Sequence, residues 1–344
     1  MKTYIFLGSL ALGAQLAASG AMANDLTVAT WGGSYTQKQR KAIIDPFSSA
    51  TGTKVLDAAY SGGLGQIRAM VEAGNTTWDV IQLGAAEVIN ACAEGLVVPL
   101  DVSKLKHAAE FDKSSVSECA IGSAGWSMII GYNSKAVSAE PTSWADFWDI
   151  KKYPGKRAMR REAKYNLEAA LLADGVKPEE LYQILGTPAG VERAFKKLDE
   201  LKPNIQWWET GAQPAEWLGN GAVAMSTSFI GRILEAKAEG APVGFTWSGA
   251  MYSVDSWAII SGTKNEAAAY DFVNFATSAQ AQAEFSKLQP VAPVNLGSAA
   301  LLPAERVAIM PVGDNLAKNI HLDHVFWNDN LEALTERFNA WLAR

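Results

Sequence analysis

The sequence predicts an exported α/β protein built as two lobes, each with a mostly parallel sheet flanked by helices. Three observations lead to this expectation. The chain has 344 residues, which is long enough for two lobes that each bury a core. Short apolar runs alternate with longer amphipathic segments, a pattern typical of βαβ units and a parallel sheet. No Pro- or Ser-rich linker divides the chain, so we expect it to cross between the lobes more than once.

The first 23 residues are expected to be a secretory signal peptide, removed from the mature protein. Lys2 supplies a positive end, residues 5–18 form an apolar stretch, and Ala21-Met22-Ala23 matches a cleavage pattern. The apolar stretch is too short to span a bilayer. No cysteine follows the cleavage site to carry a lipid anchor. We therefore expect a periplasmic protein.

Charge and cysteine content narrow the class further. The formal net charge is −6 and no basic tract occurs, which argues against nucleic acid or an anionic membrane surface as a partner. Cys92 and Cys119 lie in a chain expected to reach an oxidising compartment. We expect them to form a disulfide. Two separate buried thiols are the alternative.

The expected elements follow one another in a regular order. Strands are expected at residues 26–30, 54–59, 78–84 and 125–132, at a run ending near 160, and at 204–208, 222–226, 243–247 and 254–260. Helices are expected at residues 37–51, 66–73, 85–93, 142–147, 166–174, 178–185, 191–201, 214–218, 230–239, 264–277, 279–287 and 330–342. Trp144, Trp148 and Trp341 fall on helical faces, and we expect them to pack in the core.

The first strand runs into Trp31-Gly32-Gly33-Ser34-Tyr35 and then into a helix. Ligands of open α/β sheets bind at the carboxyl ends of strands, which is where this segment would lie. Ser34 or Thr36 is a candidate helix cap, and a helix N-terminus favours anionic or polar ligand groups. The alternative is a tight turn with a packing tryptophan.

The sequence lacks the common motifs of enzymes and metal sites. The sequence has no Gly-x-Ser-x-Gly elbow, no Walker loop and no complete Gly-x-Gly-x-x-Gly. His321 and His324 are spaced to touch one metal ion, but without neighbouring cysteines they are better explained as polar surface. We therefore expect neither an enzyme nor a cofactor nor a metal.

Six short stretches together indicate a family. In chain order they are Thr30-Trp31…Tyr35, Thr51-Gly52-Thr53-Lys54-Val55, Trp78-Asp79-Val80, Glu94-Gly95-Leu96, Thr142-Ser143-Trp144-Ala145-Asp146-Phe147-Trp148 and Val254-Asp255-Ser256-Trp257-Ala258-Ile259. In this order, behind a signal peptide, they resemble the extracellular solute-binding proteins of ABC importers. The resemblance is strongest to the spermidine/putrescine-binding branch.

The resemblance implies a type II-like periplasmic-binding-protein fold, in which two α/β lobes clamp a ligand by hinge closure. Carried onto this chain, it places residues 24–132 plus 255–286 in the first lobe and residues 133–254 plus 287–344 in the second. It also implies a small-molecule amine or zwitterion as ligand and an inner-membrane ABC permease as partner. We expect a monomer.

Asp255 is the strongest candidate for a ligand contact. The aspartate of polyamine binders that aligns here pairs with a ligand ammonium, and an unpaired carboxylate inside an apolar strand would be unfavourable. A structural ion pair or a helix cap is the alternative. Arg232 follows Phe229, which aligns with a cleft aromatic, and an arginine there suits a ligand carboxylate. Pairing with Asp255 or Glu235 is the alternative for Arg232.

This chain departs from the polyamine binders at two places where they carry acids. It reads Gly32-Gly33-Ser34 in the first loop, and at residues 160–162 only Glu162 is acidic. Fewer carboxylates suit a ligand with a single cationic end, such as the ω-amino acid 4-aminobutyrate. The alternatives are a strict putrescine or spermidine binder using Glu162, Glu209 and Asp255, or a secreted enzyme or chemoreceptor adaptor on the same fold.

Aromatic residues at or near strand ends are expected to form the walls of the cleft, where they can pack on methylenes and on an ammonium. The full set of expected ligand-binding residues is Trp31, Ser34, Tyr35, Gly84, Arg161, Glu162, Trp208, Phe229, Arg232, Trp247, Tyr252 and Asp255.

Overall fold

The computed structural model describes residues 25–111 and 115–344. The predicted signal peptide lies outside these residues. The described strands join into one sheet in the order β2-β1-β3-β8-β4-β7-β5-β6, with β9 beside β8. Their bounds are β1 (Leu26–Thr30), β2 (Val55–Ala59), β3 (Val80–Gly84), β4 (Ile121–Asn133), β5 (Arg157–Arg160), β6 (Ile205–Trp208), β7 (Met225–Phe229), β8 (Val243–Ile259) and β9 (Ile320–His321).

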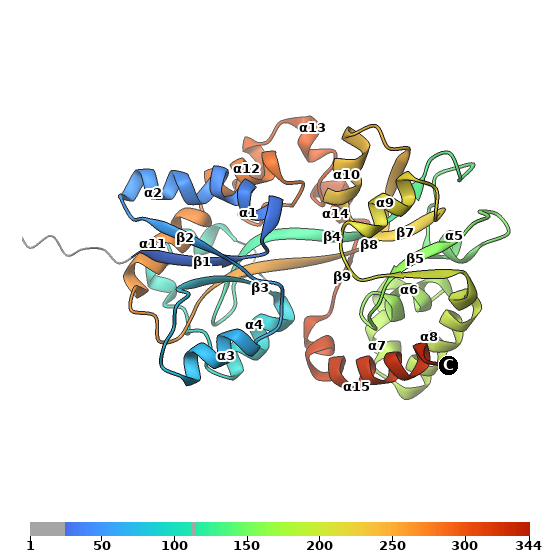
Figure 1. Cartoon of the computed structure of the whole chain (residues 1–344), viewed down its shortest axis with the longest axis horizontal. Helices are drawn as coiled ribbons and strands as arrows, with labels where there is room; N and C mark the ends of the chain where they lie inside the picture. The colour runs from blue at the N-terminus through green and yellow to red at the C-terminus, as the bar shows by residue number, and fades with distance from the viewer. Residues whose placement is uncertain (1–24, 112–114) are drawn as a thin grey trace, which may run out of the picture.

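Two long strands, β4 and β8, carry the sheet from one lobe to the other (Figure 1). The first lobe is built on β1, β2 and β3, and the second on β5, β6 and β7; within each lobe these strands pair in parallel, as predicted. The crossing strands pair antiparallel with each other and with both lobes. The loop expected between residues 247 and 254 is part of β8, because β4 offers hydrogen-bonding partners on both sides of it.

Helices cover both faces of the sheet in each lobe (Figure 1). Their bounds are α1 (Gly33–Gln39), α2 (Asp45–Thr51), α3 (Gly65–Glu72), α4 (Ala85–Ala93), α5 (Trp144–Trp148), α6 (Asn166–Ala173), α7 (Leu181–Leu185), α8 (Pro188–Leu201), α9 (Gln213–Gly219), α10 (Ile230–Ala238), α11 (Glu266–Ala276), α12 (Ala279–Leu288), α13 (Ala304–Val307), α14 (Gly313–Leu316) and α15 (His324–Leu342). Of these described helices, none has the length and apolarity that crossing a membrane requires.

The helix expected at residues 37–51 is divided in the structure. A π-helical turn, Arg40–Ile44, separates α1 from α2. Pro46 in the first turn of α2 explains the interruption, because proline has no N–H to donate and its ring clashes with the carbonyl four residues earlier. The expected cap by Ser34 or Thr36 is wrong: the helix begins after Gly32, without a side-chain cap.

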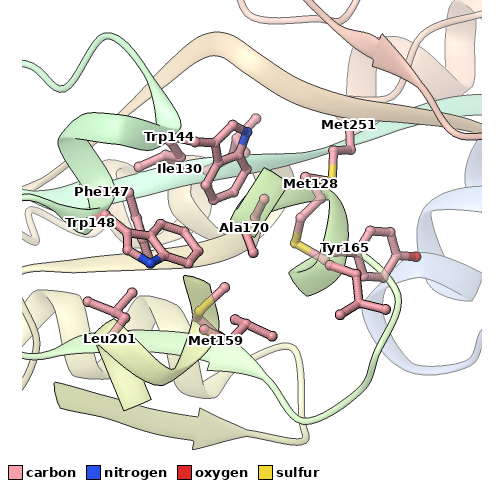
Figure 2. Close-up of a cluster of buried hydrophobic side chains, with 14 of the residues drawn as sticks. Met128, Ile130, Trp144, Phe147, Trp148, Met159, Tyr165, Ala170, Leu201 and Met251 are labelled. Carbon is pink, nitrogen blue, oxygen red and sulfur yellow. The ribbon is translucent and has the colours of Figure 1, made fainter. Parts of the chain in front are cut away.

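Each lobe has its own hydrophobic core. In the second lobe, Met128 and Ile130 of β4 and Met251 of β8 pack on aromatic residues of α5 (Figure 2). The predicted packing roles of Trp144, Trp148 and Trp341 are confirmed, since all three lie in this core. The aromatic helix is capped as its sequence indicates, by the Ser143 hydroxyl accepting from the Asp146 N–H at 3.2 Å.

The C-terminal segment after α12 contributes to both lobes. Val291 and Val294 pack into the core of the first lobe, beside Leu26 and Phe285. Trp327, on α15, packs into the core of the second lobe. The residues after 287 are therefore shared between the lobes.

Candidate ligand-binding cleft

The carboxyl ends of strands from both lobes point at one region beside the crossing strands. Trp31 follows β1, Tyr60 follows β2, and β3 ends at Gly84. In the second lobe, β5 ends at Arg160 and β7 at Phe229. The end of a parallel strand exposes backbone groups that its neighbours do not use, so this arrangement favours a ligand between the lobes.

Asp255 lies at the centre of this region. On β8 it pairs with Gly84 of β3 and Ala124 of β4, and it is only 7% exposed. Its Oδ2 accepts a hydrogen bond from Trp31 Nε1 at 2.9 Å, and its Oδ1 accepts one from Trp126 Nε1 at 2.8 Å. In the described residues no cation lies within ion-pair distance of this carboxylate. Its partners are two neutral indoles, which leaves its charge uncompensated.

A small network of polar side chains, Ser123 and Gln82, fixes the backbone of Asp255. The pairing of β4 with β8 shifts register between Gly122 and Ala124, which is a bulge at Ser123. The Ser123 hydroxyl donates to the Asp255 carbonyl at 2.8 Å and accepts from Gln82 Nε2 at 2.8 Å. The backbone of Asp255 is therefore anchored independently of its carboxylate.

Burial raises the pKa of the Asp255 carboxyl from 3.8 to about 7. The indole hydrogen bonds of Trp126 and Trp31 lower this pKa, Glu87 raises it slightly, and Lys164 lowers it. Desolvation dominates because a charged carboxylate away from water has lost its hydration. A ligand ammonium would restore the missing compensation and favour the ionised form.

Aromatic rings continue outward from Asp255 on both sides. Trp31 lies 5.1 Å from the ring of Tyr60 in the first lobe. Trp126 lies 6.3 Å from Tyr165 and 5.5 Å from Phe229 in the second lobe. These rings offer faces for methylenes and for a cation. Tyr60, Trp126 and Tyr165 were not predicted from the sequence, although Tyr60 follows directly after an expected strand.

Arg160 occupies the position beside the aromatic rings that was predicted for Arg161. The Arg160 guanidinium lies 5.5 Å from the Trp208 ring and 5.7 Å from the Phe229 ring, and its Nε is 2.9 Å from Glu162 Oε1. Burial raises the pKa of Glu162, and Arg160 and then Lys164 oppose the shift. Arg161 points outward and pairs with Glu209 at 3.0 Å, with side chains 53% and 65% exposed.

Lys164 and Tyr165 come from the loop that joins β5 to α6. The Lys164 Nζ lies 5.4 Å from the centre of the Tyr165 ring. Tyr165 has φ of 70°, the one positive φ among described non-glycine residues. Such a conformation costs roughly 1–3 kcal/mol and is concentrated at functional sites. Figure 2 shows the Tyr165 hydroxyl pointing away from the core cluster. Apart from their position after an expected strand, nothing in the sequence indicated that Lys164 and Tyr165 belong to the site.

Glu87 connects three segments on the first-lobe side of the cleft by hydrogen bonds. Its Oε1 accepts from the Tyr60 hydroxyl at 2.8 Å and from the Gly63 N–H at 2.7 Å. Its Oε2 accepts from the Gly84 N–H at 3.1 Å. This carboxylate therefore ties α4 to the ends of β2 and β3, and its lone pairs are largely engaged.

Three other predicted residues, Ser34, Tyr35 and Trp247, have surroundings of their own. Ser34 is exposed on the first turn of α1. The Tyr35 hydroxyl accepts from Gln82 at 2.9 Å, and its ring packs edge-on against Phe285. Burial first, and then the charge of Asp255, raise the pKa of Tyr35. Trp247 packs in the core of the second lobe, 5.5 Å from the ring of Phe245.

One predicted residue points away from the candidate cleft, and another pairs with a neighbour on its own helix. Tyr252 lies three positions before Asp255 on β8, so its side chain is on the opposite face, against His321. Arg232, in the first turn of α10, is 46% exposed and lies 3.3 Å from Glu235. Pairing with Glu235 was the alternative considered for Arg232 from sequence.

The predicted disulfide is confirmed. Cys92 and Cys119 are joined, with Cα atoms 5.8 Å apart and a sequence separation of 27. The bridge ties the end of α4 to the segment that leads into β4. Within the described ranges, no three His, Cys, Asp or Glu side chains gather in a way that could hold a metal ion.

Comparison with known proteins identifies the family. The model of the bacterial extracellular solute-binding protein family matches residues 42–311. The gamma-aminobutyric acid-binding protein of Pseudomonas aeruginosa is 44% identical over 329 residues, covering 95% of this chain and 94% of its own. The spermidine/putrescine-binding periplasmic protein of Escherichia coli is 25% identical over 278 residues, covering 78% of this chain and 76% of its own.

A solved GABA receptor has a TM-score of 0.85 and 35% identity, covering 93% of this chain and 98% of its own. The sequence resemblance to solute-binding proteins of ABC importers and the predicted two-lobe α/β fold are thereby confirmed. The family model matches more than half of this chain, so this chain belongs to the bacterial extracellular solute-binding proteins.

Proposed function

We propose that this chain is the periplasmic binding component of an ABC importer and captures a short ω-amino acid of the 4-aminobutyrate class. The observation that supports this most is Asp255, a buried carboxylate whose hydrogen-bond donors are the two neutral indoles of Trp31 and Trp126. A relative 44% identical over almost the whole chain is a gamma-aminobutyric acid-binding protein. We propose that the protein works as a monomer with its permease.

In this proposal the ligand ammonium binds the Asp255 carboxylate between the two indoles. Its methylenes pack on Trp126 and Phe229, and its carboxylate is bound by an arginine of the second lobe. Arg232 remains the predicted partner, since its contact with Glu235 is long and solvent-exposed and therefore weak. Arg160, whose guanidinium lies near the rings of both Trp208 and Phe229, is the other arginine near the cleft.

Lobe closure would complete the site. Trp31 and Asp255 meet at one side of the ligand, whereas Arg160 and Phe229 belong to the second lobe. A ligand that contacts both lobes stabilises the closed form by its differential affinity for it. The Lys38–Glu235 ion pair at 2.8 Å and the packing of α15 on α4 are contacts between the lobes that are formed in this structure and that opening would break.

A strict polyamine binder is less well supported. That function would use Glu162, Glu209 and Asp255, but Glu209 is exposed beside Arg161 and Glu162 is paired with Arg160. A dication would therefore have one uncompensated carboxylate, Asp255, and would compete with arginines for the others.

Calorimetric titration with 4-aminobutyrate, putrescine, spermidine and choline tests the proposal. We expect 4-aminobutyrate to bind and the polyamines to bind far more weakly. Asp255→Asn should reduce the affinity by about thirtyfold or more, because losing a buried charge partner costs roughly 2–5 kcal/mol. Arg232→Ala should reduce it comparably if Arg232 holds the carboxylate. Binding of putrescine without 4-aminobutyrate would refute the proposal.

A further inference from the structure

Lys164 is a charged residue of the cleft that the proposed ligand contacts do not use. It lies in the loop after β5, on the second-lobe side, with its Nζ 5.4 Å from the ring of Tyr165. That ring is 6.3 Å from Trp126, whose indole donates to Asp255. Lys164 is thus separated from the proposed ammonium site by two aromatic side chains, and it is partly buried.

The ammonium of Lys164 has no hydrogen bond or ion pair with any residue of the described ranges. Burial lowers its pKa, and the carboxylates of Glu168 and Glu162 oppose that shift, with a smaller effect from Glu87. The Lys164 ammonium therefore interacts electrostatically with carboxylates on both sides of the cleft, but it forms a direct ion pair with none of them. A positive charge held in this way acts on whatever occupies the space between the lobes.

The acids around Lys164 are already engaged by other groups. Glu162 is paired with Arg160 at 2.9 Å. Glu168 is fully buried, and its Oε1 accepts hydrogen bonds from Tyr182 and Trp327. Asp255 also has only neutral donors, the indoles of Trp31 and Trp126, and it differs from Glu168 in lying where strands of both lobes end. The cleft therefore combines one site for an ammonium, at Asp255, with two cations, Lys164 and Arg160, on the second-lobe side.

We propose that Lys164 determines specificity, by repelling a second ammonium at the end of the ligand distant from Asp255. The proposal rests on the proposed function, in which one ligand amine binds Asp255. Lys164 attracts a ligand whose far end is anionic and has little effect on one whose far end is neutral. A diamine places its second ammonium near the Lys164 ammonium, and the two like charges repel each other. Repulsion of a competitor contributes to specificity as directly as attraction of the preferred ligand.

Three ligands of similar length separate these effects. They are 4-aminobutyrate, 1-aminobutane and putrescine, whose far ends are anionic, neutral and cationic. For the unaltered protein we expect affinity to fall in that order. In Lys164→Met, the affinity of putrescine relative to 1-aminobutane should rise by about tenfold, and that of 4-aminobutyrate relative to 1-aminobutane should fall. Lys164→Arg keeps the charge and should retain the original order.

The controls separate this proposal from the one it rests on. Lys135→Met removes an exposed lysine of the same lobe and should leave all three affinities unchanged. Lys164→Gln is a second neutral variant, and thermal unfolding of each variant reports on folding. If putrescine and 1-aminobutane keep their affinity ratio in both neutral variants, the role of Lys164 is refuted. If the unaltered protein binds none of the three ligands, the proposed function itself fails.

Discussion

The Asp255 carboxyl changes its protonation near neutral pH, which couples ligand affinity to pH. Burial raises its pKa from 3.8 to about 7 in the folded chain. An ammonium binds the ionised form, so ligand binding below pH 7 must release a proton. We expect the affinity for 4-aminobutyrate to rise by up to about tenfold per pH unit between pH 5 and 7 and to level off above pH 7.

Calorimetry at pH 6 in buffers of different ionisation enthalpy measures this proton directly. Glu168 is a suitable control, because burial raises its pKa to about 6 while its hydrogen bonds go to Tyr182 and Trp327. Glu168→Gln should leave the proton release unchanged. Binding at pH 6 without proton release would mean that the ligand amine does not meet Asp255.

Site residues could be predicted from the sequence where one residue differs chemically from its neighbours. Asp255 is an isolated acid inside an apolar strand, and Trp31 is an aromatic residue beside two glycines. The direction of a side chain was not predictable where neighbours have similar chemistry. Arg160 and Arg161 are consecutive, and only the end of β5 decides that Arg160 lies against Trp208 and Phe229.

Among the elements, the crossing strands approach each other closely at Gly125. A Cβ added there would lie 2.1 Å from the Tyr252 hydroxyl oxygen and 2.7 Å from the ring carbon that bears it. The ring has little room to move, because Tyr252 is buried and packs on His321. We expect Gly125→Ala to destabilise the protein by about 1–3 kcal/mol, as overpacking commonly does. Denaturant unfolding measures this change.

Gly65 provides the matched control for that substitution. It is the first residue of α3, and a Cβ added to it would meet nothing within 4 Å. Gly65→Ala should therefore be neutral or slightly stabilising, because alanine loses less backbone freedom on folding than glycine does. If the two variants are equally stable, the crossing strands can shift at Gly125 to accommodate the added methyl group.

Most elements were predictable from periodicity, but the continuity of β8 was not. The local pattern predicted two strands, at residues 243–247 and 254–260, separated by a loop. Pairing with β4 overrides that local signal. Had residues 243–260 been treated as one strand, alternation would have placed Tyr252 and Asp255 on opposite faces. The separation of Tyr252 from the cleft is thus a consequence of tertiary pairing.

For the whole molecule, the order of six weak motifs was sufficient to predict two lobes with crossing strands. The path of the chain after residue 287 was harder to predict. Val291 and Val294 pack with the first lobe, while α15 returns to the second. Sequence alone contained no signal for this return, because both segments are apolar and either core could accommodate them.

The two lobes are linked directly by Lys38 of α1. Its Nζ lies 2.8 Å from Glu235 of α10 and 2.7 Å from Gln289 Oε1. Lys38 and Glu235 are 25% and 36% exposed, so the pair is partly screened and contributes about 0.2–1 kcal/mol. Because the contact exists only while the lobes are together, Lys38→Met should lower the population of the closed form. We expect ligand affinity to fall about two- to fivefold.

Small-angle X-ray scattering of the ligand-free protein reports on closure independently of affinity. Lys38→Met should increase the radius of gyration, and saturating ligand should restore it. Lys41→Met is the control, because this neighbouring lysine is exposed and makes no ion pair in the part of the chain that the structure describes. The effect of Lys38 should also weaken with added salt, since partly exposed pairs are screened. An unchanged affinity with an unchanged radius would mean that closure is maintained by other contacts, with the packing of α15 on α4 as the remaining candidate.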